Sequence, residues 1–399
     1  MSDYYANSLG FNATLPLKEQ TLQSNTGETI TWHKYFLDLA TNYIGEALIY
    51  AEAALDNGLK LDDADTQKID DMIAELKESA KDEGMSFNRY LKEQYGKGVR
   101  EEDIRRCTEM LLMAEKQIDS IDDSISPTDK EVEDYYQKNR KFIDSMSYVS
   151  YSFSGSTAKT RAQEAAKAKN AEEFKKYLVN FIKNNTSHKT DTAALKEYES
   201  HISENVYFSE ESDTMNWLYD SKRKAGDTYI EVTDLSTTVY FVLSPAVRNT
   251  KQSVNIRHIL LTTTTYSNLA AAKFKGEELL AEWQKTPTTQ KFSELAKEYS
   301  EDVDTSESGG LYEDYLAGGI ENAYEFDEWC FAEGRKAGDA EVIGTEYGAH
   351  FMYLESLGRA EWEITSRQNL IDEISAKYSD EYLEKYTITY DETVINSVG

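Results

Sequence analysis

Two histidines could do chemistry together, because each lies in an apolar run that alternates like a β-strand. His258 belongs to the stretch VNIRHILL, and His350 belongs to the stretch YGAHFMYLE. Between them lie a loop with adjacent glycines at 309–310 and an aromatic helix, EFDEWCF. Two hydrogen-bonded imidazoles can hold each other in one tautomer and orient a polar group beside them. We therefore expect chemistry on a polypeptide chain where these four pieces meet.

The composition limits the partners of such a site. A formal net charge of −30 argues against nucleic acids and anionic membrane surfaces, which both need a basic protein surface. An unfolded polypeptide that is neutral or cationic would be attracted instead, although the same acidity also serves plain solubility. No run of about 18 apolar residues is present, so no segment of this chain is expected to insert into a membrane.

Metal and disulfide chemistry are not expected. Cys107 and Cys330 lie in helix-like segments with apolar neighbours, which argues against a disulfide and against a cysteine metal site. The acidic stretch from Asp302 to Glu313 has the spacing of a calcium loop, but Glu307 stands where the sharp turn requires glycine. We predict no metal and no cofactor.

The elements before the histidine-bearing region are expected to be helical. Apolar residues recur at helical spacing from Trp32 to Asn57, with Gly58 as a plausible end, and further helices follow up to residue 144. Residues 1–30 are polar and turn-rich, so we expect an irregular arm there. From Ser147 the period changes to two in SYVSYSFS, which predicts a strand.

An internal repeat organises the following part of the chain. WLYDSKRKAGD at 217–227 and WCFAEGRKAGD at 329–339 share a tryptophan, an aromatic residue and the turn RKAGD, and an apolar strand follows each. The period of roughly 110 residues is too long for a solenoid and implies two related β–α–α–β domains in tandem.

Four segments result from these patterns. They are a helical domain at 1–144, a first β–α–α–β domain at 145–250, a second one at 251–358, and a C-terminal helix within 359–399. A single helix of this length is marginal in isolation. We therefore expect the last segment to return to the helical domain and complete it.

The second of these domains resembles the parvulin-type peptidyl-prolyl cis–trans isomerases. The matching pieces are RHIL at 257–260, FSELAKEYSED at 292–302, GGL at 309–311, RKAGD at 335–339 and YGAHF at 347–351. The wider layout is similar to extracytoplasmic foldases of the PrsA and SurA type, in which parvulin domains are joined to a helical chaperone domain. The resemblance implies an α+β fold with a discontinuous all-helical chaperone-like domain and two tandem parvulin-like domains, each a small antiparallel sheet with helices.

The resemblance also implies the residues of the site. His258, Asp302 and His350 take the catalytic positions, and the carboxylate of Asp302 would tune the histidine pair electrostatically. The positions that would surround the prolyl ring of a substrate are Ile320, Phe326, Phe331 and Tyr347. Phe326 would form the proline pocket itself. Tyr312 departs from the family, which commonly has glycine there.

The implied reaction is non-covalent isomerisation of X-Pro bonds in unfolded or exported polypeptides. Rotation about such an amide faces a resonance barrier of ~18–20 kcal/mol in an ordinary peptide bond, but no covalent bond has to form or break. An apolar cup for the prolyl ring and polar groups for the carbonyl can favour the twisted amide. The stretch after the first strand, LLTTTTYSNLAAAKF, has no basic residue before Lys273, so no phosphate requirement is expected.

The first repeat keeps the scaffold and loses the histidines. SYVSYSF stands in place of RHIL, TTVYFVL stands in place of YGAHF, and no Gly-Gly pair lies between them. His188 and His201 fall in a polar insertion and are expected to be exposed in loops. We predict that this domain is degenerate and does not catalyse isomerisation.

Other interpretations fit parts of the sequence. A non-catalytic holdase or assembly chaperone would use the second domain only to bind extended segments. A cell-surface adhesion protein fits the acidity and the 28 tyrosines, but not the retained histidine pair. The resemblance implies an extracytoplasmic location, at a bacterial cell surface or secreted, with a leader or anchor outside this sequence. No oligomeric state follows from the sequence.

Overall fold

The computed structural model describes residues 10–24, 27–209 and 212–395. Its contacts divide the chain into two compact units. One unit joins Met1–Ser126 to Ile371–Gly399, and the other comprises Pro127–Leu370. Among the described residues, no helix is both long enough and apolar enough to span a membrane.

The first unit is mainly helical. Its elements are β1 (Thr21–Gln23), β2 (Thr29–Thr31), α2 (Trp32–Asp56), α3 (Asp63–Asp82), α4 (Phe87–Tyr95), α5 (Glu101–Ser124), the later part of α15 (Glu361–Lys385), and α16 (Glu392–Ile395). Side-chain caps explain two of the helix starts, because Thr31 accepts from the backbone of Lys34 and Asp62 forms a capping box at α3. The long helix predicted from Trp32 is confirmed.

The expected irregular arm is only partly described. Residues 1–9 and 25–26 of that arm lie outside the described residues. In the rest, β1 and β2 pair as a short antiparallel sheet, with Leu22 opposite Ile30. This pairing was not predicted, because three-residue strands leave no clear alternation in the sequence.

The C-terminal part of α15 packs against helices from the start of the chain. Gln117 Nε2 donates a hydrogen bond to the Tyr382 hydroxyl at 3.2 Å. The Tyr382 ring meets the Tyr50 ring edge-on, with centroids 5.8 Å apart. The ammonium of Lys385 lies 3.1 Å from the carboxylate of Asp56. Segments from both ends of the chain therefore build one unit.

The second unit holds the two repeats. Its elements are α6 (Asp129–Ile143), then β3 (Ser145–Phe153), α7 (Ala158–Ala165), α8 (Ala171–Asn185), α9 (Asp191–Glu199), β4 (Ile202–Tyr207), α10 (Asp213–Leu218), β5 (Thr228–Val232) and β6 (Thr237–Val247), then β7 (Gln252–Thr262), α11 (Thr263–Tyr266), α12 (Leu269–Trp283), α13 (Thr289–Tyr299), β8 (Leu311–Tyr315), α14 (Tyr324–Cys330), β9 (Ala340–Thr345), β10 (Gly348–Ala360), and the start of α15.

Helix α6, which the sequence analysis grouped with the helical segment, lies in this second unit. The Tyr136 ring packs on the Trp362 ring at the start of α15, with centroids 5.1 Å apart. Arg367 donates a hydrogen bond to the carbonyl of Pro127 at 2.6 Å. These contacts between residues distant in sequence explain why the helix belongs here.

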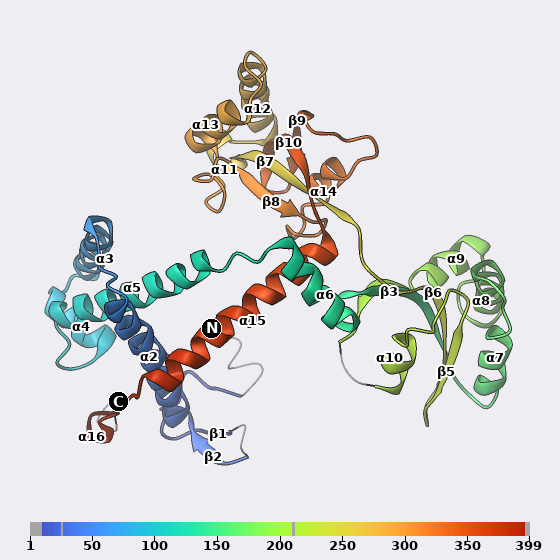
Figure 1. Cartoon of the computed structure of the whole chain (residues 1–399), viewed down its shortest axis with the longest axis horizontal. Coiled ribbons are helices and arrows are strands. Elements are labelled where there is room, and N and C mark those ends of the chain that lie inside the picture. Colours follow the sequence, from blue (N-terminus) through green and yellow to red (C-terminus); the bar gives the residue numbers. More distant parts are fainter. Residues whose placement is uncertain (1–9, 25–26, 210–211, 396–399) are drawn as a thin grey trace. The chain divides into compact units, whose positions relative to one another are not determined.

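The two repeats have the same sheet topology. The strand order is β4-β3-β6-β5 in the first and β8-β7-β10-β9 in the second, and every pairing is antiparallel. Helices α7 and α8 lie against the first sheet, and α12 and α13 lie against the second (Figure 1). The predicted tandem repeat and the α+β fold class are confirmed.

One expectation for the first repeat was wrong. The polar stretch assigned to loops contains helix α9, whose Ala194 and Tyr198 are buried in the domain core. His201 follows this helix and is half-buried, with its ring 4.8 Å from the Tyr151 ring. His188 lies in the loop between α8 and α9 and is also only partly exposed.

Candidate active site

The two histidines of the second repeat lie on neighbouring central strands. On the β7–β10 ladder His258 is opposite Met352, and His350 is opposite Leu260. The histidines are therefore diagonal neighbours on one face of the sheet, within reach of each other. Their Nδ1 atoms are 3.1 Å apart and their rings stack at an interplanar angle of 16°.

The alternation of side chains along β7 and β10 shows which face of the sheet the histidines occupy. Ile259 and Leu261 point to the core beneath α12 and α13, together with Phe351. Residues of the opposite parity, Ile256 and Met352, point to a second cluster that includes α14. Both histidines share that second face, because side chains one residue apart on a strand point to opposite sides.

A carboxylate reaches the histidine pair from the loop 300–310. The Oδ2 atom of Asp302 lies 2.8 Å from Nε2 of His258, and it also accepts a hydrogen bond from the Thr305 hydroxyl. The loop is tied to the strand, because the amide of His258 donates to the carbonyl of Gly310 at 2.9 Å. The amide of Gly310 in turn donates to the carbonyl of Thr305.

The Gly-Gly pair makes this loop possible. Gly309 and Gly310 have φ values of +72° and +77°, a region that favours glycine. A Cβ atom on Gly310 would lie only 2.2 Å from the carbonyl oxygen of His258, and one on Gly309 would lie 1.9 Å from the Ser293 hydroxyl. The backbone can therefore approach β7 closely enough to deliver Asp302 only with glycine at these positions.

When both imidazoles are neutral, one choice of tautomers satisfies every hydrogen bond between Thr345, His350, His258 and Asp302. The Thr345 hydroxyl donates to Nε2 of His350 at 2.8 Å, and Nδ1–H of His350 donates to Nδ1 of His258. Nε2–H of His258 then donates to Asp302. The donors all point in one direction, toward the carboxylate.

Burial and neighbouring groups set the charges. Burial lowers the pKa of His350 to about 3, and the adjacent His258 acts in the same direction. The hydrogen bond from His258 holds the pKa of Asp302 below its usual range, although burial opposes this effect. At neutral pH the site therefore contains a neutral His350 beside an ionised Asp302.

Aromatic side chains enclose the pair. The Phe326 ring, from α14, meets both imidazoles nearly perpendicularly, with each centroid 5.6 Å away. The Tyr312 ring, from β8, lies 5.2 Å from the His258 ring, and its hydroxyl is 3.5 Å from Asp302. Burial, followed by the charge of Asp302, raises the pKa of Tyr312 to about 12. Tyr312 is thus a protonated hydroxyl at the edge of the site.

The remaining candidates lie further out. Phe326 is fully buried, whereas Ile320 is partly buried and packs on the same apolar cluster. The Phe331 ring stacks on the Tyr315 ring, with centroids 6.2 Å apart, rather than on the histidines. Tyr347 is 42% exposed, and its hydroxyl donates to the carbonyl of Glu321 at 2.7 Å. This bond ties the β9–β10 turn to the loop before α14.

Thr305 and Thr345 also belong to the site, and no sequence pattern predicted a role for them. Each threonine forms a hydrogen bond at one end of the Asp302–His258–His350 chain. A hydroxyl three residues after the acid, and another five residues before the second histidine, were visible in the sequence. Many threonines nearby share such spacing, so only the structure singles these two out.

The comparisons with known proteins agree with this geometry at the domain level. Residues 242–355 match the family model described as the PPIC-type PPIase domain. The matched residues span the second repeat up to β10 and include His258, Asp302 and His350 together.

One curated relative is the foldase protein PrsA 1 of Listeria monocytogenes. It is 25% identical to this chain over 132 residues, which cover 33% of this chain. The aligned part spans only 38% of the length of that relative.

Solved structures with matching chains include PrsA of Bacillus subtilis, at 15% identity and a TM-score of 0.38, with 96% of this chain and 98% of that chain covered. Another describes SurA-like chaperones of Campylobacter jejuni, at 15% identity and a TM-score of 0.22, with 84% and 98% covered.

Proposed function

We propose that this chain is a peptidyl-prolyl cis–trans isomerase and foldase that acts on X-Pro bonds of unfolded polypeptides. The observation that carries the proposal is the buried chain from Asp302 through His258 to His350, set against Phe326 inside a PPIC-type PPIase domain. The helical unit, formed by both ends of the chain, would supply chaperone activity. The division of the repeats at 250 and 358 remains our proposal for how these activities are distributed, whereas α6, which ends at Ile143, lies with the repeats and not with the helical unit.

Phe326 and its neighbours would act on the prolyl ring. Phe326 and Met352 are buried apolar side chains in the cluster beside the histidines, and a pocket lined by them would favour a proline ring over water. Because Phe326 is fully buried, we infer that the partly buried Tyr312 and Ile320 move aside as the ring enters.

Asp302 would act on the amide electrostatically. Amide resonance places negative charge on the oxygen and gives the C–N bond its partial double-bond character. A fixed carboxylate near that oxygen disfavours the charge-separated form and therefore favours the twisted amide, without forming a covalent bond. The histidine pair would hold the carboxylate in place and ionised.

We propose that phosphorylated substrates are not required. The segment between β7 and α12, residues 263–268, contains no lysine or arginine, and the first basic side chain there is Lys273 on α12. A phosphate group would be bound best by arginine or lysine side chains. The surroundings of the site instead contribute Asp302, Asp304 and Glu301, which would repel it.

Isomerase activity on a non-phosphorylated X-Pro peptide tests the proposal. We expect catalysis by the full chain, a slower rate on the matched phosphoserine-proline peptide, and loss of catalysis in His258→Ala. A chain that fails to isomerise the peptide but still suppresses aggregation of an unfolded protein would instead be a holdase.

We also propose an extracytoplasmic location. One matched structure describes a periplasmic chaperone, and the curated relative is named a foldase. Fractionation of cells that express the full gene, followed by detection of this chain in the cytoplasm, would contradict the assignment.

A further inference from the structure

Helix α2 of the helical unit leaves large apolar side chains exposed. The exposed fractions are 64% for Tyr43, 48% for Ile44 and 60% for Leu55. The same helix also buries Ile49 and Ala53, so it is apolar around most of its circumference. A surface helix normally confines apolar residues to one stripe, and contiguous exposed apolar surface commonly marks a binding site.

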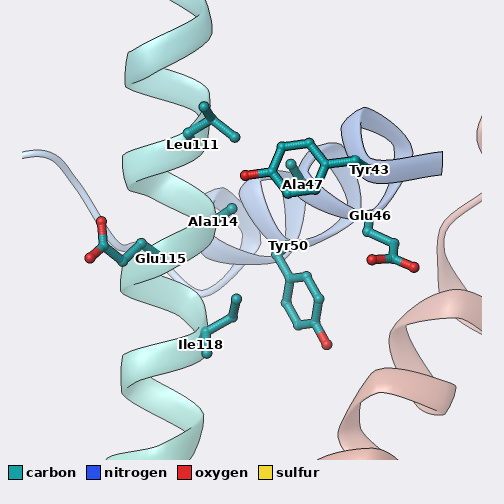
Figure 2. A pocket seen from close by; sticks show the side chains of 8 residues that line it. All are labelled: Tyr43, Glu46, Ala47, Tyr50, Leu111, Ala114, Glu115 and Ile118. Atoms are coloured by element: carbon teal, nitrogen blue, oxygen red, sulfur yellow. The ribbon is translucent and has the colours of Figure 1, made fainter. Parts of the chain in front are cut away.

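One of these exposed side chains, Tyr43, lines a groove between α2 and α5. The groove has a volume of about 350 Å³, within the usual range of ligand sites. Its lining residues are Tyr43, Glu46, Ala47, Tyr50, Leu111, Ala114, Glu115 and Ile118. The small side chains of Ala47 and Ala114 are buried where the helices meet, and larger apolar groups flank them (Figure 2).

The charged residues of the groove are both acidic. Glu46 comes from α2 and Glu115 from α5, and their carboxylates stand at the outer edges, with the apolar groups between them (Figure 2). Both residues are exposed, and neither forms an ion pair with any other residue in the described part of the chain. The lining therefore combines an apolar centre with two negative edges.

These features define the chemistry of an occupant. We propose that the α2–α5 groove binds a short polypeptide segment in which apolar side chains alternate with lysine or arginine. The apolar side chains would fill the space beside Ala47 and Ala114, and the cations would meet Glu46 and Glu115. A second copy of this chain fits poorly, because each copy has a net charge of −30 and the groove edges would repel an acidic surface.

A groove of this kind would give the helical unit of the proposed foldase a specific class of peptide to bind. The proposal rests on the foldase function in one respect, that the ligand is a polypeptide. The groove and the histidine site are different places in the chain. A peptide without proline therefore separates the two, because it offers the isomerase site no X-Pro bond.

The test is fluorescence anisotropy of labelled, proline-free peptides titrated with the full chain. The first peptide alternates leucine and lysine, the second replaces each lysine by glutamate, and the third replaces each leucine by serine. We expect the first peptide to bind at least about tenfold more tightly than either of the others, because binding needs both the apolar side chains and the positive charges. Equal affinity for the lysine and glutamate peptides would overturn the proposal.

Two double variants locate the binding. Glu46→Lys with Glu115→Lys should weaken binding of the lysine peptide by about tenfold or more and improve binding of the glutamate peptide. Tyr43→Ser with Ile118→Ser should weaken binding of the lysine peptide by a similar factor, on the order of tenfold. All four side chains are exposed, so the fold of the unit should persist.

Matched controls exclude general effects of charge and exposure. Asp71→Lys with Glu75→Lys makes the same charge change on α3, and Leu55→Ser removes an exposed apolar residue of α2 outside this groove. Neither should change the affinity, and His258→Ala should not change it either. The assignment would be overturned if the control variants weakened peptide binding and the groove variants left it unchanged. Sedimentation showing self-association that Tyr43→Ser abolishes would also overturn it, because a second copy would then be the occupant.

Discussion

The two repeats of this chain share a sheet topology and differ on one face of the sheet. In the first repeat the amide of Gly226 donates to the carbonyl of Val242, and in the second the amide of Gly338 donates to Leu354, both at 2.9 Å. The RKAGD turn is thus held to the last strand of its repeat, β6 or β10, in the same way twice. The scaffold survives in both copies because each keeps these backbone hydrogen bonds and an apolar core between its sheet and its helices.

Across this common backbone the histidine positions carry small hydroxyl residues in the first repeat. Ser150 is opposite Tyr240 on its ladder, as His258 is opposite Met352. Counted from the shared hydrogen bond, Thr238 takes the place of His350. Tyr148 and Tyr240 instead pack edge to face there, with centroids 5.7 Å apart.

The two repeats also differ in the segment that carries Asp302 in the second repeat. In the second repeat the loop 300–310 follows α13 and ends at Gly310, whose carbonyl binds the amide of His258. In the first repeat the equivalent bond goes from the amide of Ser150 to the carbonyl of His201, directly after helix α9. Helix α9 thus takes the place of the loop that carries Asp302 in the second repeat. The difference teaches that the helix-facing side specifies the fold, whereas the opposite side and one loop specify the chemistry.

The largest effect should come from removing a histidine in the second repeat only. We expect His258→Ala to lower kcat/KM for a non-phosphorylated X-Pro peptide by about a hundredfold or more, because the carboxylate loses its fixed donor. Protease-coupled or NMR exchange measurements on the full chain report the rate. Ser150→Ala, at the equivalent position of the first repeat, is the control and should leave the rate unchanged. Equal losses in both variants would erase the functional distinction between the repeats.

The glycine of the carboxylate loop should be nearly as sensitive. We expect Gly310→Ala to destabilise the second repeat by about 2–3 kcal/mol, because the residue has a positive φ and its new Cβ would meet the His258 carbonyl. Urea unfolding followed by domain-resolved hydrogen exchange measures this. Gly334→Ala shares the positive φ, at +84°, but has open space around it. It should cost only about 1 kcal/mol.

Acid should weaken the second repeat through His350. The unfolded chain takes up a proton near pH 6.5, whereas the folded site keeps this imidazole neutral down to a pKa of about 3. The unfolded state therefore binds more protons between these values, so the stability due to His350 is complete above pH 6.5 and is lost as pH falls toward 3. We expect a loss of roughly 2 kcal/mol between pH 7.5 and pH 5.

Hydrogen exchange of the β7 and β10 amides, corrected for intrinsic rates, measures this loss against β3 and β6 in the same molecule. His350→Gln keeps hydrogen-bonding capacity but cannot titrate, so the pH dependence of the second repeat should flatten. A wild-type profile that matches the variant would contradict the burial argument.

The smallest expected effect is no change in isomerase activity when histidines are introduced into the first repeat. Ser150→His combined with Thr238→His, in a His258→Ala background, restores the histidine types on equivalent strands of the first repeat. We expect no recovery of isomerase activity, because α9 replaces the loop that would carry a carboxylate. Recovery in the peptide assay would show that the histidine pair alone is sufficient.

Periodicity and repeat patterns accounted for much of the fold. The long helix from Trp32, the strands around both histidines and the tandem repeat were all predictable, because each leaves an apolar period or a copied motif. Helix α9 was missed, since its sequence is polar and it buries only Ala194 and Tyr198. The three-residue strands β1 and β2 were missed for lack of length.

The sequence by itself identified His258 and His350 as the candidate pair, because each lies in an alternating apolar run and the resemblance pairs them, and the missing histidines exclude the first repeat. Only the tertiary structure decided that Asp302, Thr305 and Thr345 complete a single hydrogen-bonded chain. The physical reason is that the carboxylate arrives through a loop of positive-φ glycines pressed against the β7 backbone. Such a close approach depends on distances between segments far apart in sequence, which no local pattern records.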